Sequence, residues 1–478
     1  MTLTVIDSAT IVTVDAERRV IDDGRLLIDG PLISAVGRKN EIPLPPGATM
    51  IDGSGMVAMP GLIDGHGHAG HTLLKSIGAG RSGQWQDAVH TIFAKASSPT
   101  YWYADARLLA LERLKAGVTT GISLLGGGDD VMRTNHVVYG EQHKAGIDNL
   151  GLRSFLAVGP GRPPFPIDYV RWQNGVGQPQ SVSYDLQMQT SEAVIQSSHN
   201  KAGSRVQIAM TMPVYKPWEI GELLSFEDAK AMSRDVMAMA QEYGLLLTQD
   251  GHREGSLALA GKLGLLGSRS LMSHSVDLTE EDFTAVVESD TRIIHNPYAV
   301  RSILGRCPVP ELMDAGVTVL LGSDAAGPDR SYDMFRHMSQ AMHYHRRHFR
   351  DPNILPPGKM LEMVTIDAAY GLGLENDLGS LEAGKKADVI LIDMRKPHLF
   401  PPQMPVMRLA HYVTAADVDT VIVEGEVLMR HRKILSADEE DILDNAKTEF
   451  DLALDRSGLR HLIEEPDGFW RQTTWDNG

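Results

Sequence analysis

The chain has 478 residues, of which 42% are hydrophobic and 22% are charged, and its formal net charge is −17 at pH 7. A (β/α)8 barrel uses roughly 250 residues, so this length leaves room for a smaller module beside one. The acidic balance excludes nucleic acid as the expected partner, because phosphate backbones are bound by clustered Lys and Arg. A single cysteine, Cys307, excludes an intramolecular disulfide framework.

The N-terminal segment alternates like a β-strand and lacks the charged and apolar regions of a secretory signal. No apolar run approaches the roughly 20 residues that span a bilayer. We therefore expect a cytoplasmic protein that acts on a small molecule and has neither a membrane nor a nucleic-acid partner.

Both ends of the chain have the texture of short β-strands. In residues 1–58, Val, Ile and Leu alternate with polar residues, and Gly and Asp separate the apolar stretches. The same pattern occurs in residues 387–395 (ADVILIDMR) and 419–429 (DTVIVEGEVLM). We predict one composite β-sandwich from residues 1–58 and 376–435. The barrel then spans residues 59–375, and a helical extension follows over residues 436–478.

The middle of the chain alternates amphipathic helices with short apolar strands. Helices are predicted at 103–116, 226–243 and 280–289, and each leads into an apolar strand. This alternation indicates an α/β fold with a parallel sheet, and about eight such units close a TIM-type barrel. The Pro- and Gly-rich residues 159–179 are predicted to form a loop over the active site.

Two histidines follow a short apolar strand in residues 60–68 (PGLIDGHGH). Alternate residues of a strand face the same side, so His66 and His68 can share one metal ion. A second candidate is Asp324, which follows the apolar residues 316–321. A carboxylate at the end of a buried strand must be paired or bind a metal, because desolvating it alone is costly.

Residues 60–68 resemble the first-strand metal motif of the amidohydrolase superfamily. Further resemblances follow in order over nearly the whole chain: residues 112–120 (ERLKAGVTT), His274, residues 295–297 (HNP), residues 316–324 and residues 368–393. The closest branch contains triazine chlorohydrolases, cytosine-type and S-adenosylhomocysteine deaminases, and hydrolases of phenylureas and thiocarbamates.

The resemblance implies roles for several residues. Asp324 would be both a metal ligand and the base that takes a proton from water. His274 would hydrogen-bond the attacking water or the developing oxyanion, and His295 would either contact the substrate or brace the barrel rim. The alternatives are structural: a His-x-His pair arising by chance, a helix-capping Asp324 and a core histidine at 274.

The fifth barrel strand departs from the family pattern. Relatives read roughly H-x-H-x-x-E, whereas residues 244–254 here read GLLLTQDGHRE. Counting from Gly244 places Asp250 where the metal histidine is expected, and Gln249 points to the other side. We favour His252 as the ligand because imidazole is the commoner ligand of a borderline metal. Asp250 is then its hydrogen-bonded partner or an alternative ligand, and Glu254 the proton-shuttling acid.

We expect one divalent ion per chain, zinc before cobalt, manganese or iron. Members with two metal ions use a carboxylated lysine on the fourth strand, and Lys216 lies beyond that strand's predicted end. The loop at 163–172 (PPFPIDYVRW), with Tyr169 and Trp172, suggests an apolar or aromatic substrate.

The predicted activity is hydrolysis of a carbon–nitrogen bond in an amide, urea or (thio)carbamate by metal-activated water. The alternatives are a deaminase or dechlorinase of a nitrogen heterocycle, and a catalytically inactive barrel used for binding. The resemblance to this family also implies a homo-oligomer.

Overall fold

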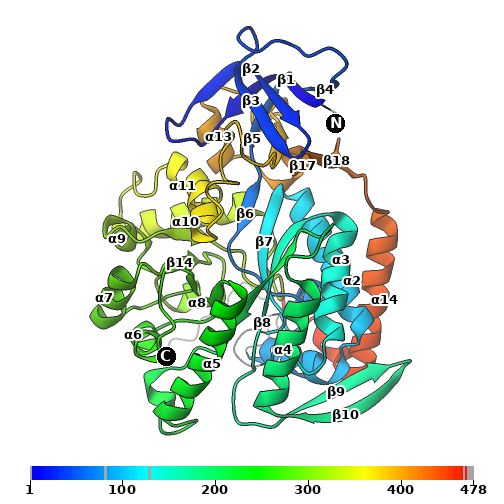
Figure 1. Ribbon diagram of the computed structural model, residues 1–478, viewed down its shortest axis with the longest axis vertical. Helices are drawn as coiled ribbons and strands as arrows, with labels where there is room; N and C mark the ends of the chain where they lie inside the picture. The colour runs from blue at the N-terminus through cyan, green and yellow to red at the C-terminus, as the bar shows by residue number, and fades with distance from the viewer. Residues whose placement is uncertain (1–2, 80–82, 128–130, 467–468, 471–478) are drawn as a thin grey trace.

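The computed structural model describes residues 3–79, 83–127, 131–466 and 469–470, arranged as a large barrel below a smaller β domain (Figure 1). Eight parallel strands form the barrel sheet, and a parallel bridge between Gly67 and Asp324 links its first and last members. The predicted TIM-type barrel is thus confirmed. In spatial order the strands are β6 (Leu62–Asp64), β7 (Val118–Leu124), β8 (Arg153–Val158), β11 (Val206–Thr211), β12 (Leu247–Gln249), β13 (Ser270–Ser273), β14 (Arg292–His295) and β15 (Val319–Leu321).

Helices cover the outside of the barrel, and the strands are accordingly buried along their length, as both faces of a parallel sheet require. Two helices coincide with the sequence prediction, at 226–243 and 280–289. The predicted helix at 103–116 begins earlier, at Pro99, because the Ser98 side chain accepts a hydrogen bond from Tyr101 N–H and caps it. The barrel helices are α2 (Pro99–Lys115), α3 (Val138–Leu150), α4 (Tyr184–Ser198), α5 (Phe226–Tyr243), α6 (Ser256–Leu263), α7 (Glu280–Ser289), α8 (Val300–Leu304), α9 (Val309–Asp314), α10 (Met334–Phe349), α11 (Pro357–Met363) and α12 (Ile366–Gly371).

The β domain is assembled from both ends of the chain. Strand β5 pairs antiparallel with β16, so that Met59 lies opposite Ile390 within one nine-stranded sheet. An apolar cluster between these strands includes Ile6, Leu26 and Leu391. The strands are β1 (Leu3–Val12), β2 (Val20–Asp29), β3 (Leu32–Arg38), β4 (Thr49–Asp52), β5 (Met56–Pro60), β16 (Val389–Asp393), β17 (Val418–Val423), β18 (Glu426–Arg430) and β19 (Lys433–Ile434), and helix α13 (Pro405–His411) lies between β16 and β17.

The segment expected as a loop over the active site contains a β-hairpin instead. Strands β9 (Ile167–Gln173) and β10 (Val176–Val182) pair antiparallel around Asn174–Gly175. Both turn residues have positive φ, at 49° and 77°, which is the geometry that Asn-Gly favours in two-residue hairpins. The hairpin extends along the side of the barrel near helix α14 (Glu439–Ser457; Figure 1). The Asn-Gly pair is the sequence feature that indicates this hairpin, and the loop prediction did not use it.

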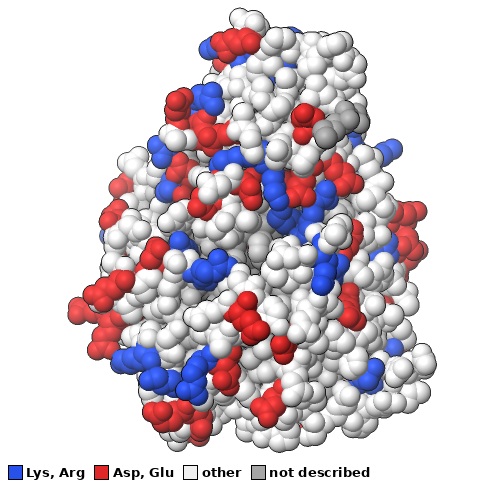
Figure 2. Space-filling view, in the orientation of Figure 1, with Lys and Arg blue, Asp and Glu red and all other residues white. Residues whose placement is uncertain are grey.

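The C-terminal extension is helical and packs on the barrel. Helix α14 (Glu439–Ser457) lies against α2, where Ser98 Oγ is 3.0 Å from Glu449 Oε2. Trp470 is 83% exposed, and Trp475 lies outside the described residues. Acidic and basic side chains are interspersed on the face shown in Figure 2. Among the described residues, no helix combines the length and apolar character needed to cross a membrane.

Candidate active site

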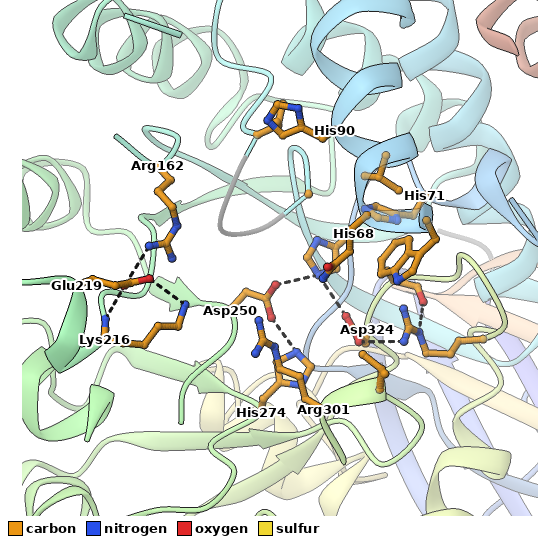
Figure 3. A pocket seen from close by; sticks show the side chains of 18 residues that line it. His68, His71, His90, Arg162, Lys216, Glu219, Asp250, His274, Arg301 and Asp324 are labelled. Atoms are coloured by element: carbon orange, nitrogen blue, oxygen red, sulfur yellow. Dashed lines mark hydrogen bonds and ion pairs between the residues drawn. The ribbon is translucent and has the colours of Figure 1, made fainter. Parts of the chain in front are cut away.

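A pocket of about 330 Å³ opens at the carboxyl ends of the barrel strands (Figure 3), where TIM-barrel active sites lie. His68, Asp250, His274 and Asp324 line its inner part. The segments that follow β8 and β11 form one wall, and α1 (Gln84–Thr91) together with His71 forms another.

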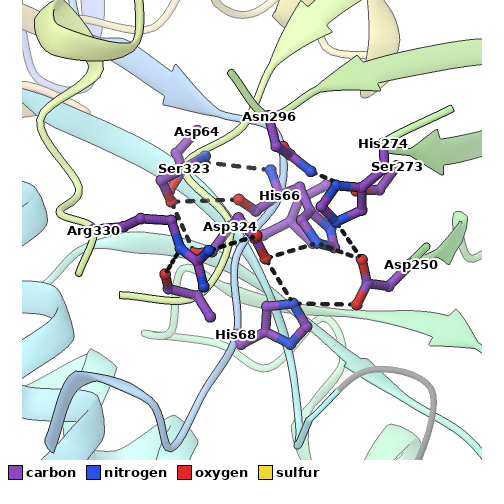
Figure 4. Close-up of polar contacts among 12 residues, drawn as sticks. Asp64, His66, His68, Asp250, Ser273, His274, Asn296, Ser323, Asp324 and Arg330 are labelled. Atoms are coloured by element: carbon purple, nitrogen blue, oxygen red, sulfur yellow. Dashed lines mark hydrogen bonds and ion pairs between the residues drawn. The ribbon is translucent and has the colours of Figure 1, made fainter. Parts of the chain in front are cut away.

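His66 and His68 follow β6 and alternate with glycines. A Cβ added at Gly65 or Gly67 would approach neighbouring side chains to 2.6 or 2.7 Å, so only glycine fits on the packed side of this segment. The histidines face the barrel mouth, where His68 Nε2 lies 3.3 Å from Asp324 Oδ1 (Figure 4). The His-x-His pair and Asp324 therefore meet although they lie more than 250 residues apart in sequence.

Four residues bring one potential ligand atom each to within 4.8 Å of the others: His66, Asp250, His274 and Asp324. His68 Nε2 joins them, 3.4 Å from Asp250 Oδ2. Nδ1 of the fully buried His66 has no hydrogen-bond partner among the described residues, and its Nε2 lies 3.3 Å from Asp250 Oδ1. Buried polar atoms rarely lack partners, so this convergence of donor atoms fits a metal ion. Imidazole and carboxylate donors suit zinc and similar divalent ions.

Both carboxylates of the cluster are held in the ionised form. Burial raises the pKa of Asp324, but the charge of Arg330 and the hydrogen bond from His68 outweigh burial and place the pKa well below its ordinary value. For Asp250, burial is likewise outweighed by His274 and His66, and the pKa is well below normal. An ionised carboxylate can bind a cation and accept a proton at neutral pH.

His274 and Asp324 both have left-handed backbone conformations, with φ of 68° and 63°. Such conformations cost a non-glycine residue on the order of 1–3 kcal/mol and persist where the surroundings enforce them. Here His274 directly follows β13, Asp324 lies three residues past the end of β15, and both side chains line the pocket.

A buried network centred on Asp64 joins the first barrel strand to helix α2 and to the segment that follows the last strand. Arg113 Nη2 lies 2.7 Å from Asp64 Oδ2, and both side chains are fully buried. The same carboxylate accepts hydrogen bonds from Ser323 N at 2.9 Å and from Ser323 Oγ at 2.7 Å. Asp64 precedes His66 by two residues and Ser323 adjoins Asp324, so this network sets the relative position of two cluster residues. The sequence signal was an aspartate inside an apolar strand.

On the fifth strand, the structure places Asp250 in the donor cluster and His252 outside it. Strand β12 ends at Gln249, and Asp250 is the next residue, with its Oδ1 2.8 Å from His274 Nε2. Gly251 has φ of 97° and turns the chain away, so the strand does not run on to His252. His252 is buried outside the cluster, with its Nδ1 3.0 Å from Ser256 Oγ. Asp250, held in reserve as an alternative ligand, is the residue that reaches the site.

The expected acid Glu254 lies outside the pocket. Its carboxylate is 45% exposed and is 2.9 Å from the Arg253 guanidinium. A different acid, Glu219, lines the pocket wall and is 3.1 Å from Arg162 Nη1. Lys216 lies past β11, as expected, and lines the same wall.

The three expected substrate contacts do not line the pocket. His295 is fully buried, with its ring 5.2 Å from that of His345. The Tyr169 hydroxyl donates to Met132 O at 2.7 Å, and Trp172 Nε1 donates to Lys95 O at 2.8 Å. The hairpin turns these aromatic side chains toward the protein, which is why the composition of residues 163–172 misled.

Sequence reasoning missed His71 and Trp85 in the pocket wall. His71 is 2% exposed, and burial together with the charges of His68 and Arg330 holds its pKa well below the ordinary value. Trp85 is partly exposed, with its ring centroid 5.7 Å from that of His71. Neither residue belongs to a recognisable motif, and only the fold brings them to the site.

Replacing Asp250 by Ala is expected to weaken metal binding by more than the roughly 10–100-fold that loss of an outer-shell partner costs. The reason is that Asp250 offers a carboxylate oxygen inside the donor cluster. Elemental analysis after dialysis against a weak chelator measures this. His252→Ala, two residues away, is the matched control and should keep its metal. Metal loss in the control and retention in Asp250→Ala would reverse the assignment.

Comparison with known proteins shows extended similarity. The model of the amidohydrolase family matches residues 57–428. The chain is 30% identical to a 5-methylthioadenosine/S-adenosylhomocysteine deaminase of Moorella thermoacetica, over 88% of this chain and 94% of the relative. It is 28% identical to a 5'-deoxyadenosine deaminase of Methanothermobacter thermautotrophicus, over 84% of this chain and 88% of the relative.

Solved structures share the fold. A zinc-bound adenosine deaminase from Xanthomonas campestris superposes with a TM-score of 0.80 at 19% identity, covering 95% of this chain and 98% of that one. A zinc complex of atrazine chlorohydrolase from Arthrobacter aurescens superposes with a TM-score of 0.72 at 24% identity, covering 94% of this chain and 100% of that one.

The family match covers most of the chain, and the curated relatives are matched over nearly their whole length. These findings set aside the catalytically inactive barrel. The chain therefore belongs to the amidohydrolase family and is a hydrolase of carbon–nitrogen bonds other than peptide bonds.

Proposed function

We propose that this hydrolase is a deaminase of amino-substituted nitrogen heterocycles and holds one divalent ion per chain, zinc foremost. It replaces an exocyclic amino group by oxygen: water adds to the ring carbon, and ammonia leaves. The observation that carries the proposal is the similarity to named deaminases over 84–88% of this chain, together with a pocket in which the ionised Asp250 and Asp324 converge with histidines as donors for the ion. The relatives, named as deaminases of adenosine-type compounds, support it.

His66, His68, Asp250 and Asp324 would hold the ion. When bound, such an ion lowers the pKa of a coordinated water to about 7. Asp324 accepts a proton from the attacking water and later delivers it to the leaving nitrogen. His274 is fixed by its 2.8 Å contact with Asp250 and hydrogen-bonds the oxygen added to the ring carbon.

A second candidate is hydrolysis of an amide, urea or (thio)carbamate. The observation that favours it is the environment of the other acids, because Glu219 is paired with Arg162 and Glu254 lies outside the pocket. Protonating a ring nitrogen calls for an additional acid, whereas a scissile acyl group needs only Asp324 to carry the proton from water to the leaving amine.

The proposal includes a cytoplasmic location, supported by the single buried Cys307. It also includes a homo-oligomer. Ile303 and Leu304, which are 80% and 78% exposed, support this assembly. Light scattering on the purified protein measures the oligomeric state.

A substrate panel separates the two candidate reactions. The zinc-loaded enzyme is given adenosine, 5'-deoxyadenosine, S-adenosylhomocysteine and cytosine in one set, and a phenylurea, a carbamate and an aryl amide in the other. Released ammonia or amine is measured. We expect kcat/KM above about 10⁴ M⁻¹s⁻¹ for at least one aminated heterocycle. Turnover confined to the acyl set would replace the deaminase proposal with the second candidate.

A further inference from the structure

His71 is a buried histidine in the pocket wall, and it has no polar partner in the described part of the chain. His71 is 2% exposed, and neither its Nδ1 nor its Nε2 has a hydrogen-bond partner among the described residues. An unpaired buried nitrogen destabilises the fold, so native proteins seldom keep one without a use. Because His71 lines the pocket, a bound molecule can supply the missing partner.

The backbone on both sides of His71 is firmly held. Gly70 N–H and Thr72 N–H donate to the buried carboxylate of Asp105 at 2.6 and 2.8 Å. The Tyr101 hydroxyl donates to Gly70 O at 2.6 Å. Side chains from α2 thus fix the turn that carries His71, as expected for a preorganised binding group.

Aromatic contacts also fix the His71 ring. Its centroid lies 5.0 Å from that of Phe93 and 5.7 Å from that of Trp85, both edge to face. Trp85 lines the same pocket as His71. The imidazole therefore keeps one orientation, and rotation toward another protein partner would break these contacts.

His71 lies next to the cluster where the reaction takes place. Its ring centroid is 5.2 Å from that of His68, whose Nε2 is 3.3 Å from Asp324 Oδ1. A substrate that reacts at this cluster consequently extends within reach of His71 and Trp85.

We propose that His71 is a specificity-determining residue whose imidazole hydrogen-bonds a ring nitrogen of a heteroaromatic substrate lying against Trp85. This inference rests on the proposed deaminase function and specifies how its substrate is recognised. A neutral imidazole offers one N–H donor and one lone pair, and an aminated heterocycle carries acceptor nitrogens next to the carbon that reacts. Phenyl and alkyl groups of acyl substrates offer no such atom.

The test compares adenosine with 1-deaza-, 3-deaza- and 7-deazaadenosine, each of which has one ring nitrogen replaced by C–H. The ratio of each analogue's inhibition constant to the KM of adenosine is measured for the zinc-loaded wild type and for His71→Phe. That variant keeps an aromatic ring but removes both nitrogens. Intrinsic differences between adenosine and each analogue cancel, because the same compounds are used with both enzymes.

We expect the ratio for one analogue to fall by at least about tenfold in His71→Phe, the size of one lost hydrogen bond. His71→Asn or His71→Gln, which keep a donor and an acceptor, should restore the ratio. His345→Phe is the matched control and should leave every ratio unchanged, since His345 is equally buried and unpartnered among the described residues but lies outside the pocket.

Two negative results are distinguishable. Wild-type enzyme that deaminates adenosine while His71→Phe changes none of the three ratios would overturn the role of His71 alone. Wild-type enzyme that turns over no aminated heterocycle would overturn the deaminase proposal, and this inference with it. Far-UV circular dichroism and zinc content establish that each variant is folded and contains zinc. If His71→Phe does not fold or does not bind zinc, the ratios of His71→Asn and His71→Gln test the role of His71 instead.

Discussion

Asp324→Asn is expected to lower kcat/KM by at least about 10⁴-fold and to leave the fold intact. A positioned general base contributes about 10²–10⁴-fold, and this side chain also lies in the donor cluster. Asparagine has nearly the same shape but cannot take a proton from water. The fold should persist because the neighbouring Arg330 retains its hydrogen bonds to Ala325 O and Gly327 O at 2.6 and 2.7 Å.

Steady-state kinetics on the zinc-loaded variant measure the loss, and thermal unfolding measures the fold. The exposed Asp329, five residues further on, provides the matched control, since Asp329→Asn makes the same chemical change outside the pocket. It should retain turnover within about twofold, because surface substitutions are usually near neutral. An Asp324→Asn enzyme with more than about 1% of wild-type kcat/KM would exclude Asp324 as the base.

Arg113→Met is expected to lower the free energy of unfolding by about 3–5 kcal/mol. The substitution leaves the Asp64 carboxylate fully buried without its guanidinium partner, and Ser323 alone cannot compensate the charge. Asp64 and Ser323 are close in sequence to His66 and Asp324, which belong to the donor cluster. Disturbing them should displace these two side chains, so zinc content should fall as well. Urea unfolding and elemental analysis measure the two effects.

Arg107→Met on the same helix is the control for this prediction. Arg107 is 2.8 Å from Asp441, whose side chain is 65% exposed, so solvent can take over from the lost partner. An ion pair to an exposed acid contributes about 0–1 kcal/mol, and Arg107 also donates to Asn149 Oδ1 at 3.1 Å, so the control should lose about 1–2 kcal/mol. Equal losses in the two variants would mean that the Arg113 pair is no more important than a surface pair.

The fold was predictable because its signals are local and repeated. Apolar periodicity gave the helices at 226–243 and 280–289 to the residue, and strand–helix alternation gave the barrel. The hairpin at β9 and β10 escaped because Pro and Gly were interpreted as loop punctuation, and the Asn-Gly turn within it was passed over.

The site was predictable where a residue follows a strand directly. His66, His68, His274 and Asp324 meet because each lies just past the end of a parallel strand. On the fifth strand, ligand chemistry favours an imidazole, but the chain turns at Gly251 and Asp250 is the side chain that lies 2.8 Å from His274. Tyr169 and Trp172 show that the aromatic composition of a loop does not predict substrate contacts, since aromatic residues near a site can pack away from it.

The pairing of β5 with β16 has a consequence for biosynthesis. Strand β5 leads directly into β6, and its hydrogen-bonding edge finds its partner only when residues 389–393 have left the ribosome. At about 5–20 residues per second, the more than 300 intervening residues leave that edge uncovered for some tens of seconds. An uncovered edge strand is a template for pairing with other chains. Nascent chains arrested before residue 389 should therefore depend on chaperones far more than the completed enzyme does.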